Sequence, residues 1–318
     1  MSGIKSISPF RWPPVQILTE TRRKSITHDG RAAFLMLLPF MIFFALFVLY
    51  PACQNLFYSF TNYKFGAQKS FIGLKNYQNL FKDGDFLTAL RNTAVYTVFS
   101  VLFLTALGLF AAAALNRRGR VVKAARTVMI VPYATSMVAV SMIWLLLLDP
   151  TNGFINKTLI ALGAAAPPKW LYDAKLALPS LIFINVWKSL GYVMLIYLSG
   201  LQNIPAEVYE AAMVDGAGAW WRFWEITLPS VAPVIFFVLI NNCIESFKTF
   251  EQVRVMTQGG PVNATTTIVY QIYNRAFTDF RMGYAAAMAV VLFAVVFAVT
   301  LVNVFLMRRN ERRGGLQL

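Results

Sequence analysis

Apolar residues occur along the chain in six long blocks, separated by polar, charged or Gly- and Pro-containing segments. Each block approaches the length of about 20 apolar residues that a helix needs to cross a bilayer. Backbone exposed to lipid must satisfy its own hydrogen bonds, so helices are the expected structure. The predicted spans are Ala32–Tyr50, Thr93–Leu115, Thr127–Leu148, Leu176–Gly200, Val231–Phe250 and Tyr284–Met307. They predict an all-α, six-helix membrane domain over 32–307, with polar tails at 1–31 and 308–318.

The composition agrees with a membrane protein. Hydrophobic residues make up 58% of the 318 positions and charged residues 14%, whereas a soluble domain carries about a quarter charged residues. The mean hydropathy is +0.56. Because the apolar residues are concentrated in long blocks, they indicate a multi-pass membrane protein rather than a large soluble core.

The distribution of basic residues predicts the orientation. The formal net charge is +15, and Lys and Arg gather at the ends of the apolar blocks. Six lie in the tail 1–31, five between Arg117 and Arg126, and four in the tail 308–318. If six helices alternate in direction, these groups share one side of the membrane, and both termini are expected in the cytoplasm. No zinc-finger or RNP-like motif occurs, so membrane lipid rather than nucleic acid is the expected partner.

Side chains that carry chemistry are sparse. His28 is the single histidine, and the two cysteines, Cys53 and Cys243, are far apart in or beside apolar blocks. They form no recognisable metal site, disulfide framework or catalytic triad. The chain also contains no G-x-x-x-x-G-K-[ST] phosphate-binding loop. We therefore expect no enzyme activity, metal or cofactor in this chain, and a separate partner would bind any ATP and Mg²⁺.

The segment 202–229, between the fourth and fifth blocks, is rich in acidic and aromatic residues. Pro205 is suited to the start of a helix, and good helix formers follow it. Gly216-Ala217-Gly218 permits a sharp turn, and Trp220–Thr227 can form a second short helix. The pattern predicts a helix–turn–helix at the membrane face, on which the Ala211-Ala212 dipeptide gives a surface of small side chains.

The residue spacing in this segment resembles the EAA loop of importer permeases in the ATP-binding-cassette (ABC) superfamily. The matching positions are Glu210, Ala211, Ala212, Asp215, Gly216, Ile226, Leu228 and Pro229. In that family the loop forms a coupling helix, which docks in a cleft on the ATPase subunit and transmits its movement. The resemblance implies that these residues couple the chain to an ATPase in another chain.

Two further regions resemble the outer loops of carbohydrate-type permeases. They are Phe71–Tyr77, and Met256–Pro261 with Ala264–Thr267 and Tyr270–Tyr273. The chain is similar to the larger permease subunits of maltose, multiple-sugar and glycerol-3-phosphate importers. The resemblance implies a type I ABC importer permease fold in the inner membrane, with a second homologous permease, two ABC ATPase subunits and an extracytoplasmic solute-binding protein. It also implies a carbohydrate substrate, moved by alternating access that ATP hydrolysis drives.

Polar side chains within the fourth and fifth blocks mark a candidate substrate path, because polar groups at membrane depth are costly and face a cavity or the protein interior. They are Lys188, Ser189, Tyr192, Asn241, Asn242, Glu245, Ser246 and Thr249. By the resemblance, Glu245, Ser246 and Thr249 match positions at which the maltose permease contacts its sugar. A second interpretation is that these groups only join helices, with Lys188 and Glu245 forming an ion pair that makes both charges tolerable.

Two alternative functions are open at this point. An ion-gradient secondary transporter needs two related repeats and intramembrane ion ligands, and six helices with an EAA-like loop argue against it. The same importer architecture could instead carry glycerol-3-phosphate or another anionic or non-sugar solute, since Lys188 suits an anionic group. The substrate classes left open are therefore a neutral sugar, an anionic solute and another non-sugar solute.

Overall fold

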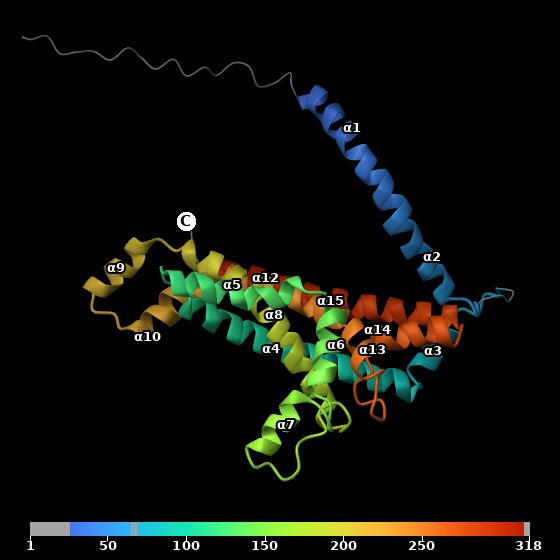
Figure 1. Cartoon of the computed structure of the whole chain (residues 1–318). Helices are drawn as coiled ribbons and strands as arrows, with labels where there is room; N and C mark the ends of the chain where they lie inside the picture. Colours follow the sequence, from blue (N-terminus) through green and yellow to red (C-terminus); the bar gives the residue numbers. More distant parts are fainter. Residues whose placement is uncertain (1–25, 65, 67–68, 315–318) are drawn as a thin grey trace, which may run out of the picture. The chain divides into compact units, whose positions relative to one another are not determined.

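The chain is helical in the part that the computed structural model describes, residues 26–64, 66 and 69–314 (Figure 1). The α-helices are α1 (Ile26–Phe44), α2 (Tyr50–Ser59), α3 (Lys75–Leu80), α4 (Gly84–Ala114), α5 (Arg120–Ala134), α6 (Met137–Leu147), α7 (Phe154–Ala161), α8 (Ala177–Gln202), α9 (Ala206–Val214), α10 (Ala219–Arg222), α11 (Leu228–Ser230), α12 (Ala232–Phe247), α13 (Glu251–Met256), α14 (Ile268–Tyr273) and α15 (Met282–Gly314). Single π-helical turns follow α1, α10 and α14, at Ala45–Leu49, Phe223–Thr227 and Asn274–Thr278. Within these described ranges the β-structure is one isolated bridge between Thr61 and Phe71, so the predicted all-α fold is confirmed.

Five helical runs among the described residues are long and apolar enough to cross a membrane. They are Ala32–Ser59, Gly84–Ala114, Ala177–Gln202, Ala232–Met256 and Met282–Arg309. These runs correspond to five of the six predicted blocks, and most of them extend further. α15 continues to Gly314, so the first part of the predicted C-terminal tail is helical. Residues 1–25 of the predicted N-terminal tail and residues 315–318 lie outside the described residues.

The third predicted block, Thr127–Leu148, is not one straight helix, and the prediction of a single span there was wrong in its geometry. α5 ends at Ala134 and α6 begins at Met137, with the two helices bent by 99°. Pro132 lies within the last turn of α5; a proline has no N–H, and its ring clashes with the carbonyl four residues earlier. The two residues after α5 are extended, with ψ of 145° and 138°. The sixth candidate span is therefore a broken pair of helices.

The N-terminal unit, which ends at Gln54, is one helical run through α1, the π-helical turn and the start of α2. In the π-helical turn, the Tyr50 N–H donates to the Ala45 carbonyl. Because Pro51 lacks an N–H and its ring crowds the carbonyl four residues before it, this wider turn accommodates the proline. Large apolar side chains are exposed along the run, among them Phe34, Met36 and Phe47, as expected of a helix that is apolar all round and faces lipid.

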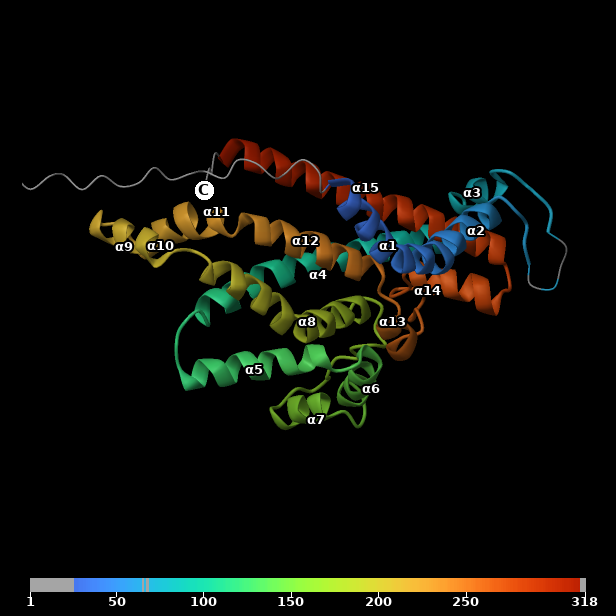
Figure 2. The ribbon, with the colours of Figure 1, turned by 90° about the horizontal axis from the view of Figure 1, so that it is seen from above.

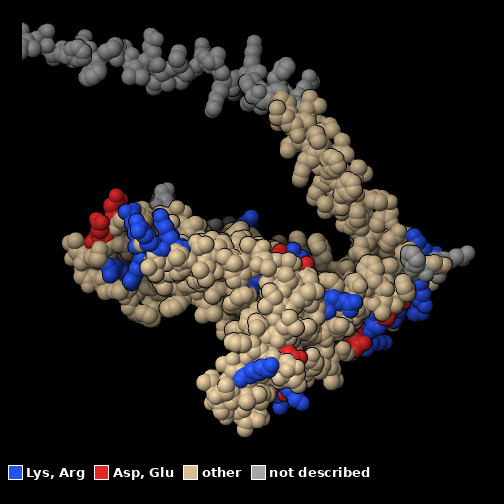
Figure 3. All heavy atoms as spheres, in the orientation of Figure 1, with Lys and Arg blue, Asp and Glu red and all other residues tan. Residues whose placement is uncertain are grey.

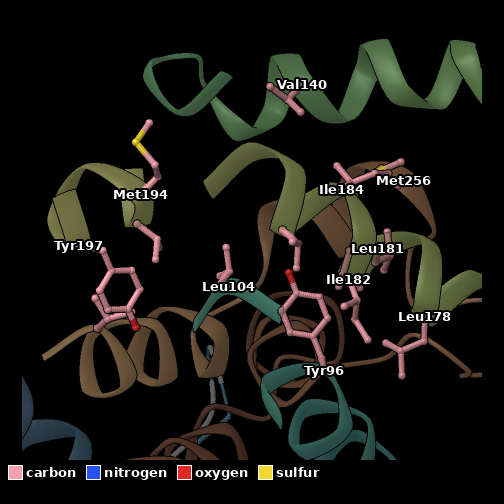
Figure 4. Close-up of a cluster of buried hydrophobic side chains, with 14 of the residues drawn as sticks. Tyr96, Leu104, Val140, Leu178, Leu181, Ile182, Ile184, Met194, Tyr197 and Met256 are labelled. Carbon is pink, nitrogen blue, oxygen red and sulfur yellow. The ribbon is translucent and has the colours of Figure 1, made fainter. Parts of the chain in front are cut away.

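In the unit that begins at Asn55, α8 is the central helix. α4, α5 and α12 pack against it, and α12 also packs against α4 and α15 (Figure 2). Fourteen of the 26 residues of α8 are buried, so neighbouring helices rather than lipid surround most of this span. Its apolar side chains meet Tyr96 and Leu104 of α4 in the main core (Figure 4). The polar residues in the middle of α8, among them Lys188 and Ser189, are therefore half-buried between helices.

Glycines on α4 and α8 allow the helices to approach closely. A Cβ on Gly191 of α8 would overlap the backbone carbonyl of Met129 on α5. Gly108 of α4 lies in a similar way against Val193 of α8. Small residues at interfaces between membrane helices let the two backbones come together. The position of α5 on α8 therefore depends on the missing side chain at Gly191.

An ion-pair cluster joins the starts of α4 and α15. The Arg275 guanidinium lies 2.9 Å from Asp279 Oδ2, 3.1 Å from Asp85 Oδ2 and 3.5 Å from Asp83 Oδ2. The Tyr284 hydroxyl donates to Asp83 Oδ2 at 2.7 Å. Partial burial raises the pKa of Asp83, but the hydrogen bonds from Tyr284 and two backbone N–H groups, with the Arg275 charge, hold this pKa below its ordinary value. Asp83 is therefore ionised at neutral pH, and the cluster ties two spanning helices together.

We predict that Gly191→Ala destabilises the transmembrane unit, because its methyl group would have to push α5 away from α8. Overpacking of this kind costs about 1–3 kcal/mol, so the thermal unfolding midpoint of the purified protein should fall by several degrees. Gly218→Ala is the matched control, since a Cβ at Gly218 meets no atom within 4 Å and its φ is −68°. Equal midpoints for the two variants would contradict the close packing of α5 on α8.

Candidate functional site

A cavity of about 460 Å³ lies beside α8 and α12, two helices that pack against each other. It is lined by all eight residues that the sequence indicated as a candidate path. α8 contributes Lys188, Ser189 and Tyr192. α12 and the residues directly after it contribute Asn241, Asn242, Glu245, Ser246 and Thr249. The fold thus brings the two predicted sets together, while their role in transport stays a prediction.

Further residues, which the sequence did not single out, complete the wall of this cavity. Tyr96 of α4, Tyr133 of α5 and Gln252 of α13 line it. The Tyr96 hydroxyl donates to Gln252 Oε1 at 3.0 Å, and Gln252 Nε2 donates to the Leu181 carbonyl at 2.8 Å. Gln252 is 1% exposed, so these hydrogen bonds fix α13 to α4 and α8. In the sequence, each of these residues is a polar side chain in or next to an apolar block. Ordinary helix packing produces the same pattern, so it did not identify them as cavity residues.

Lys188 is bound by the broken end of α5. Its Nζ donates to the Tyr133 carbonyl at 3.1 Å and lies 5.1 Å from the centre of the Tyr133 ring. The last four carbonyls of a helix have no intrahelical partner, and α5 ends one residue after Tyr133, so this carbonyl can accept. The Tyr133 ring stacks on Tyr192, with centroids 4.4 Å apart and planes within 5°. The break in the third span therefore supplies both a partner for the cation and an aromatic wall.

The ion pair predicted between Lys188 and Glu245 is not the one that forms. Glu245 Oε1 instead accepts from Lys248 Nζ at 2.8 Å. Residues three apart at a helix end are neighbours, whereas the Lys188 ammonium donates one hydrogen bond to the backbone of α5. The side chains of Glu245 and Lys248 are 64% and 58% exposed. Their pairing therefore contributes less than about 1 kcal/mol, and both groups stay accessible to a ligand.

Asn242 offers an unused hydrogen-bond donor in the cavity wall. The residue is 7% exposed, and its Nδ2 has no hydrogen-bond partner among the residues that the structure describes. Leaving a buried donor unpaired costs roughly 1–3 kcal/mol, and a hydroxyl or other acceptor on a solute would recover this cost once a local movement of the wall exposes Nδ2. With tyrosine, serine and a second asparagine nearby, the cavity can bind a polar solute by hydrogen bonds and stacking.

The segment 202–229 folds as the predicted helix–turn–helix, built from α9, α10 and the π-helical turn after it. Gly216, in the turn between α9 and α10, has φ of 79°, a left-handed conformation that residues with a Cβ disfavour. The Tyr209 hydroxyl and Thr227 Oγ1 lie 2.8 Å apart. This contact ties α9 to the π-helical turn and gives the segment a defined shape.

Of the two alanines predicted to form a surface of small side chains, Ala211 and Ala212, only the first lies on the surface. Ala211 is exposed, but Ala212 is 8% exposed and packs inside the chain. Consecutive residues on an α-helix point about 100° apart, so the prediction that both share one outer face was wrong. Ile226 and Leu228 are half-buried. The EAA-like positions open to a partner are Glu210, Ala211, Asp215, Gly216 and Pro229.

The sequence from residue 104 to residue 312 matches the family of binding-protein-dependent transport system inner membrane components. This match covers well over half of the chain. It includes every candidate path residue on α8 and α12 and the whole helix–turn–helix segment.

In the part of the chain that the structure describes, no group of three His, Cys, Asp or Glu side chains is placed to hold a metal ion.

Two relatives align with most of the chain. The sn-glycerol-3-phosphate transport system permease protein UgpA of Agrobacterium fabrum is 35% identical over 269 residues, which are 84% of this chain and 91% of the relative. The probable ABC transporter permease protein YurN of Bacillus subtilis is 35% identical over 276 residues, which are 85% of this chain and 94% of the relative. The similarity therefore extends well beyond the EAA-like segment.

The fold is also similar to solved structures. One is the crystal structure of a bacterial alginate ABC transporter in complex with an alginate pentasaccharide-bound periplasmic protein, with a TM-score of 0.80, 27% identity, and coverage of 90% of this chain and 96% of that one. Another, of a bacterial ABC transporter involved in the import of the acidic polysaccharide alginate, gives a TM-score of 0.80, 26% identity, and coverage of 90% and 98%. The chain therefore belongs to the binding-protein-dependent transport system inner membrane component family, as a membrane-spanning permease subunit of an ABC importer whose ATPase is a separate chain.

Proposed function

We propose that this permease imports a carbohydrate, and that the cavity beside α8 and α12 forms part of the solute path across the inner membrane. The observation that carries the proposal is the convergence of all eight candidate path residues on one cavity. Its volume of about 460 Å³ lies within the range of about 300–1,000 Å³ that is typical of small-molecule sites. The structural relative involved in alginate import supports a carbohydrate as the cargo.

The lining suits a solute that is rich in hydroxyl groups. Tyr133 and Tyr192 present stacked rings, whose apolar bodies can pack against a sugar ring while their hydroxyls form hydrogen bonds. Asn242 supplies an amide donor, and Asn241 and Ser246 add further polar groups. A transported solute has to leave each site again, so binding must be favourable but weak. A few hydrogen bonds and one aromatic contact meet that requirement.

The second candidate cargo is an anionic solute such as glycerol-3-phosphate, and Lys188 is the observation that favours it. Its Nζ contacts a backbone carbonyl and an aromatic ring rather than a carboxylate. The positive charge is therefore available to an anion that enters the cavity. The Agrobacterium relative is a permease of an sn-glycerol-3-phosphate transport system.

The complete importer that we infer contains a second homologous permease, two ABC ATPase subunits and an extracytoplasmic solute-binding protein. The segment 202–229 is the proposed contact with an ATPase subunit. It presents exposed Glu210, Ala211 and Asp215. Beside them Trp220, Trp221 and Trp224 are exposed, with the Trp220 and Trp224 rings in contact, and a patch of exposed apolar side chains is typical of an interaction site. ATP and Mg²⁺ bind to the ATPase subunits, and their closure moves the coupling segments and opens the path outward.

We further propose that the end of the molecule carrying this coupling segment faces the cytoplasm. Gln202, where the segment begins, lines the same hollow as the basic residues between Arg117 and Arg126. Figure 3 shows Lys and Arg side chains gathered where α5 begins. Positive charge of this kind favours the cytoplasmic side, and six alternating spans then place both termini there.

Asn242→Leu should lower uptake, because it removes the unpaired amide donor. It should not prevent assembly, because leucine has a side-chain volume similar to that of asparagine. A lost hydrogen bond of about 1 kcal/mol weakens apparent solute affinity about fivefold. Calorimetry of the cognate binding protein over neutral sugars and glycerol-3-phosphate first identifies the cargo, whose uptake is then measured in proteoliposomes. Ser141→Ala is the control, since Ser141 Oγ is also buried without a hydrogen-bond partner among the described residues but does not line the cavity. Unchanged uptake by Asn242→Leu, or an equal loss in the control, would refute the proposed path.

Gly216→Val should abolish uptake while the subunit still inserts, because a β-branched residue is strained at φ of 79° and would misplace α9. Gly218→Val is the matched control. A Cβ at either position would meet no atom within 4 Å, but Gly218 has the extended backbone that valine prefers. The measurement is solute-stimulated ATPase activity of the purified complex. Wild-type stimulation in Gly216→Val would show that the coupling assignment is wrong.

The proposed orientation can be tested by cysteine labelling in a background without Cys53 and Cys243. Val262 is 96% exposed, so Val262→Cys should react with a membrane-impermeant thiol reagent in intact cells whose outer membrane has been permeabilised. Gly314→Cys should react only after the inner membrane is opened, because α15 ends on the proposed cytoplasmic side. The reverse pattern would overturn the argument from positive charge.

A further inference from the structure

A second hollow, of about 790 Å³, lies at the end of the molecule where α4 passes into α5. Eight residues line it, and five of them are cations: Asn116, Arg117, Arg118, Gly119, Arg120, Lys123, Arg126 and Gln202. The lining contains no carboxylate. The solute path does not include any of these residues.

The charges of this basic hollow are not balanced within the described side chains. The salt bridges found among those side chains involve Arg275 and Lys248 as cations, and none of the five basic residues of the hollow. Like charges held close together repel one another. Membrane orientation requires only that positive charge lies near the helix ends, and does not require the cations to surround one hollow. An anion bound among them would relieve the repulsion.

Two local features add hydrogen-bond donors and order to the hollow. Arg126 is fixed in place, since its Nη2 donates to the Leu115 carbonyl at 2.6 Å and to the Arg117 carbonyl at 3.1 Å. α5 begins at Arg120, and its N-cap residue, Gly119, provides no side-chain cap. The first N–H groups of a helix lack intrahelical partners, and the helix dipole adds partial positive charge there. The site thus combines guanidinium, ammonium and backbone N–H donors.

The helices that form the hollow also carry apolar side chains on their surface. Phe110 of α4 and Val121 and Val128 of α5 are 73%, 82% and 70% exposed. On an inner-membrane protein such side chains face lipid or a partner, so the cations lie at a helix end beside an apolar surface. This is the level at which phosphate groups of phospholipids meet a spanning protein.

We propose that the basic hollow binds a phosphate group, supplied by the headgroup of an anionic phospholipid or by free phosphate. Guanidinium groups suit this ligand because they form paired, charge-assisted hydrogen bonds with phosphate oxygens. Gln202 is both part of the lining and the last residue of α8, directly before the coupling segment. A bound phosphate group would therefore lie at the base of that segment and support its attachment to the membrane domain.

The test uses the complete transporter, purified in a neutral detergent and titrated by calorimetry with three probes. The probes are a short-chain phosphatidylglycerol, a short-chain phosphatidylcholine and inorganic phosphate. We expect phosphatidylglycerol to bind at least about tenfold more tightly than phosphatidylcholine, and Arg118→Gln with Lys123→Gln to remove most of that preference. Arg308→Gln with Arg309→Gln is the control, because it deletes two cations of α15 that lie outside the hollow.

The two sources of phosphate give different results. If inorganic phosphate binds to the wild type and displaces phosphatidylglycerol, free phosphate is a ligand; if it does not, the lipid headgroup is the ligand. Equal binding of the two lipids by the wild type would overturn the proposal without any variant. So would equal losses in the two double variants, which would indicate general surface charge. The single change Arg118→Gln, expected to weaken binding about threefold or more, provides the same comparison if the double variant fails to assemble.

Discussion

The close contact between α5 and α8 at Gly191 is the constraint on which the solute cavity depends. Because Gly191 has no side chain, the backbone of α5 at Met129 lies directly on α8. About one helical turn further along α5, the Tyr133 carbonyl reaches Lys188 Nζ, and the Tyr133 ring stacks on Tyr192. A larger residue at position 191 would separate both pairs. The partner of the Lys188 cation and the aromatic wall of the cavity therefore follow from the same small residue.

Charge in this cavity is satisfied locally. A charged side chain within a spanning segment is costly unless it has a partner, and Lys188 finds one in the backbone of α5. Glu245 finds its partner in Lys248, at the end of its own helix. Lys188 and Glu245 thus have their contacts on opposite sides of the cavity, and relative movement of α8 and α12 would break neither. This arrangement is compatible with a path that has to open and close between the two helices.

Hydropathy predicted most of the spans, because a membrane selects long apolar blocks, and the turn at Gly216 followed from the local glycine pattern. The 99° bend after Ala134 could not be foreseen, since Pro132 is as compatible with a kinked helix as with a broken one. The sequence therefore did not indicate that the Tyr133 carbonyl would be free to accept from Lys188. Glu245 was the one opposite charge that the apolar blocks offered as a partner, so the predicted ion pair was wrong. The contact between Tyr96 and Gln252 joins residues 156 positions apart and depends on tertiary packing.

The central claim is that solute passes through the cavity lined by Lys188, Tyr192 and Asn242. The most direct measurement is a structure of the complete transporter, determined by electron cryomicroscopy while it is occluded around its cognate solute. We predict density for the solute against the Tyr192 ring and within hydrogen-bond distance of Asn242 Nδ2. Solute density on a route that contacts neither α8 nor α12 would contradict it.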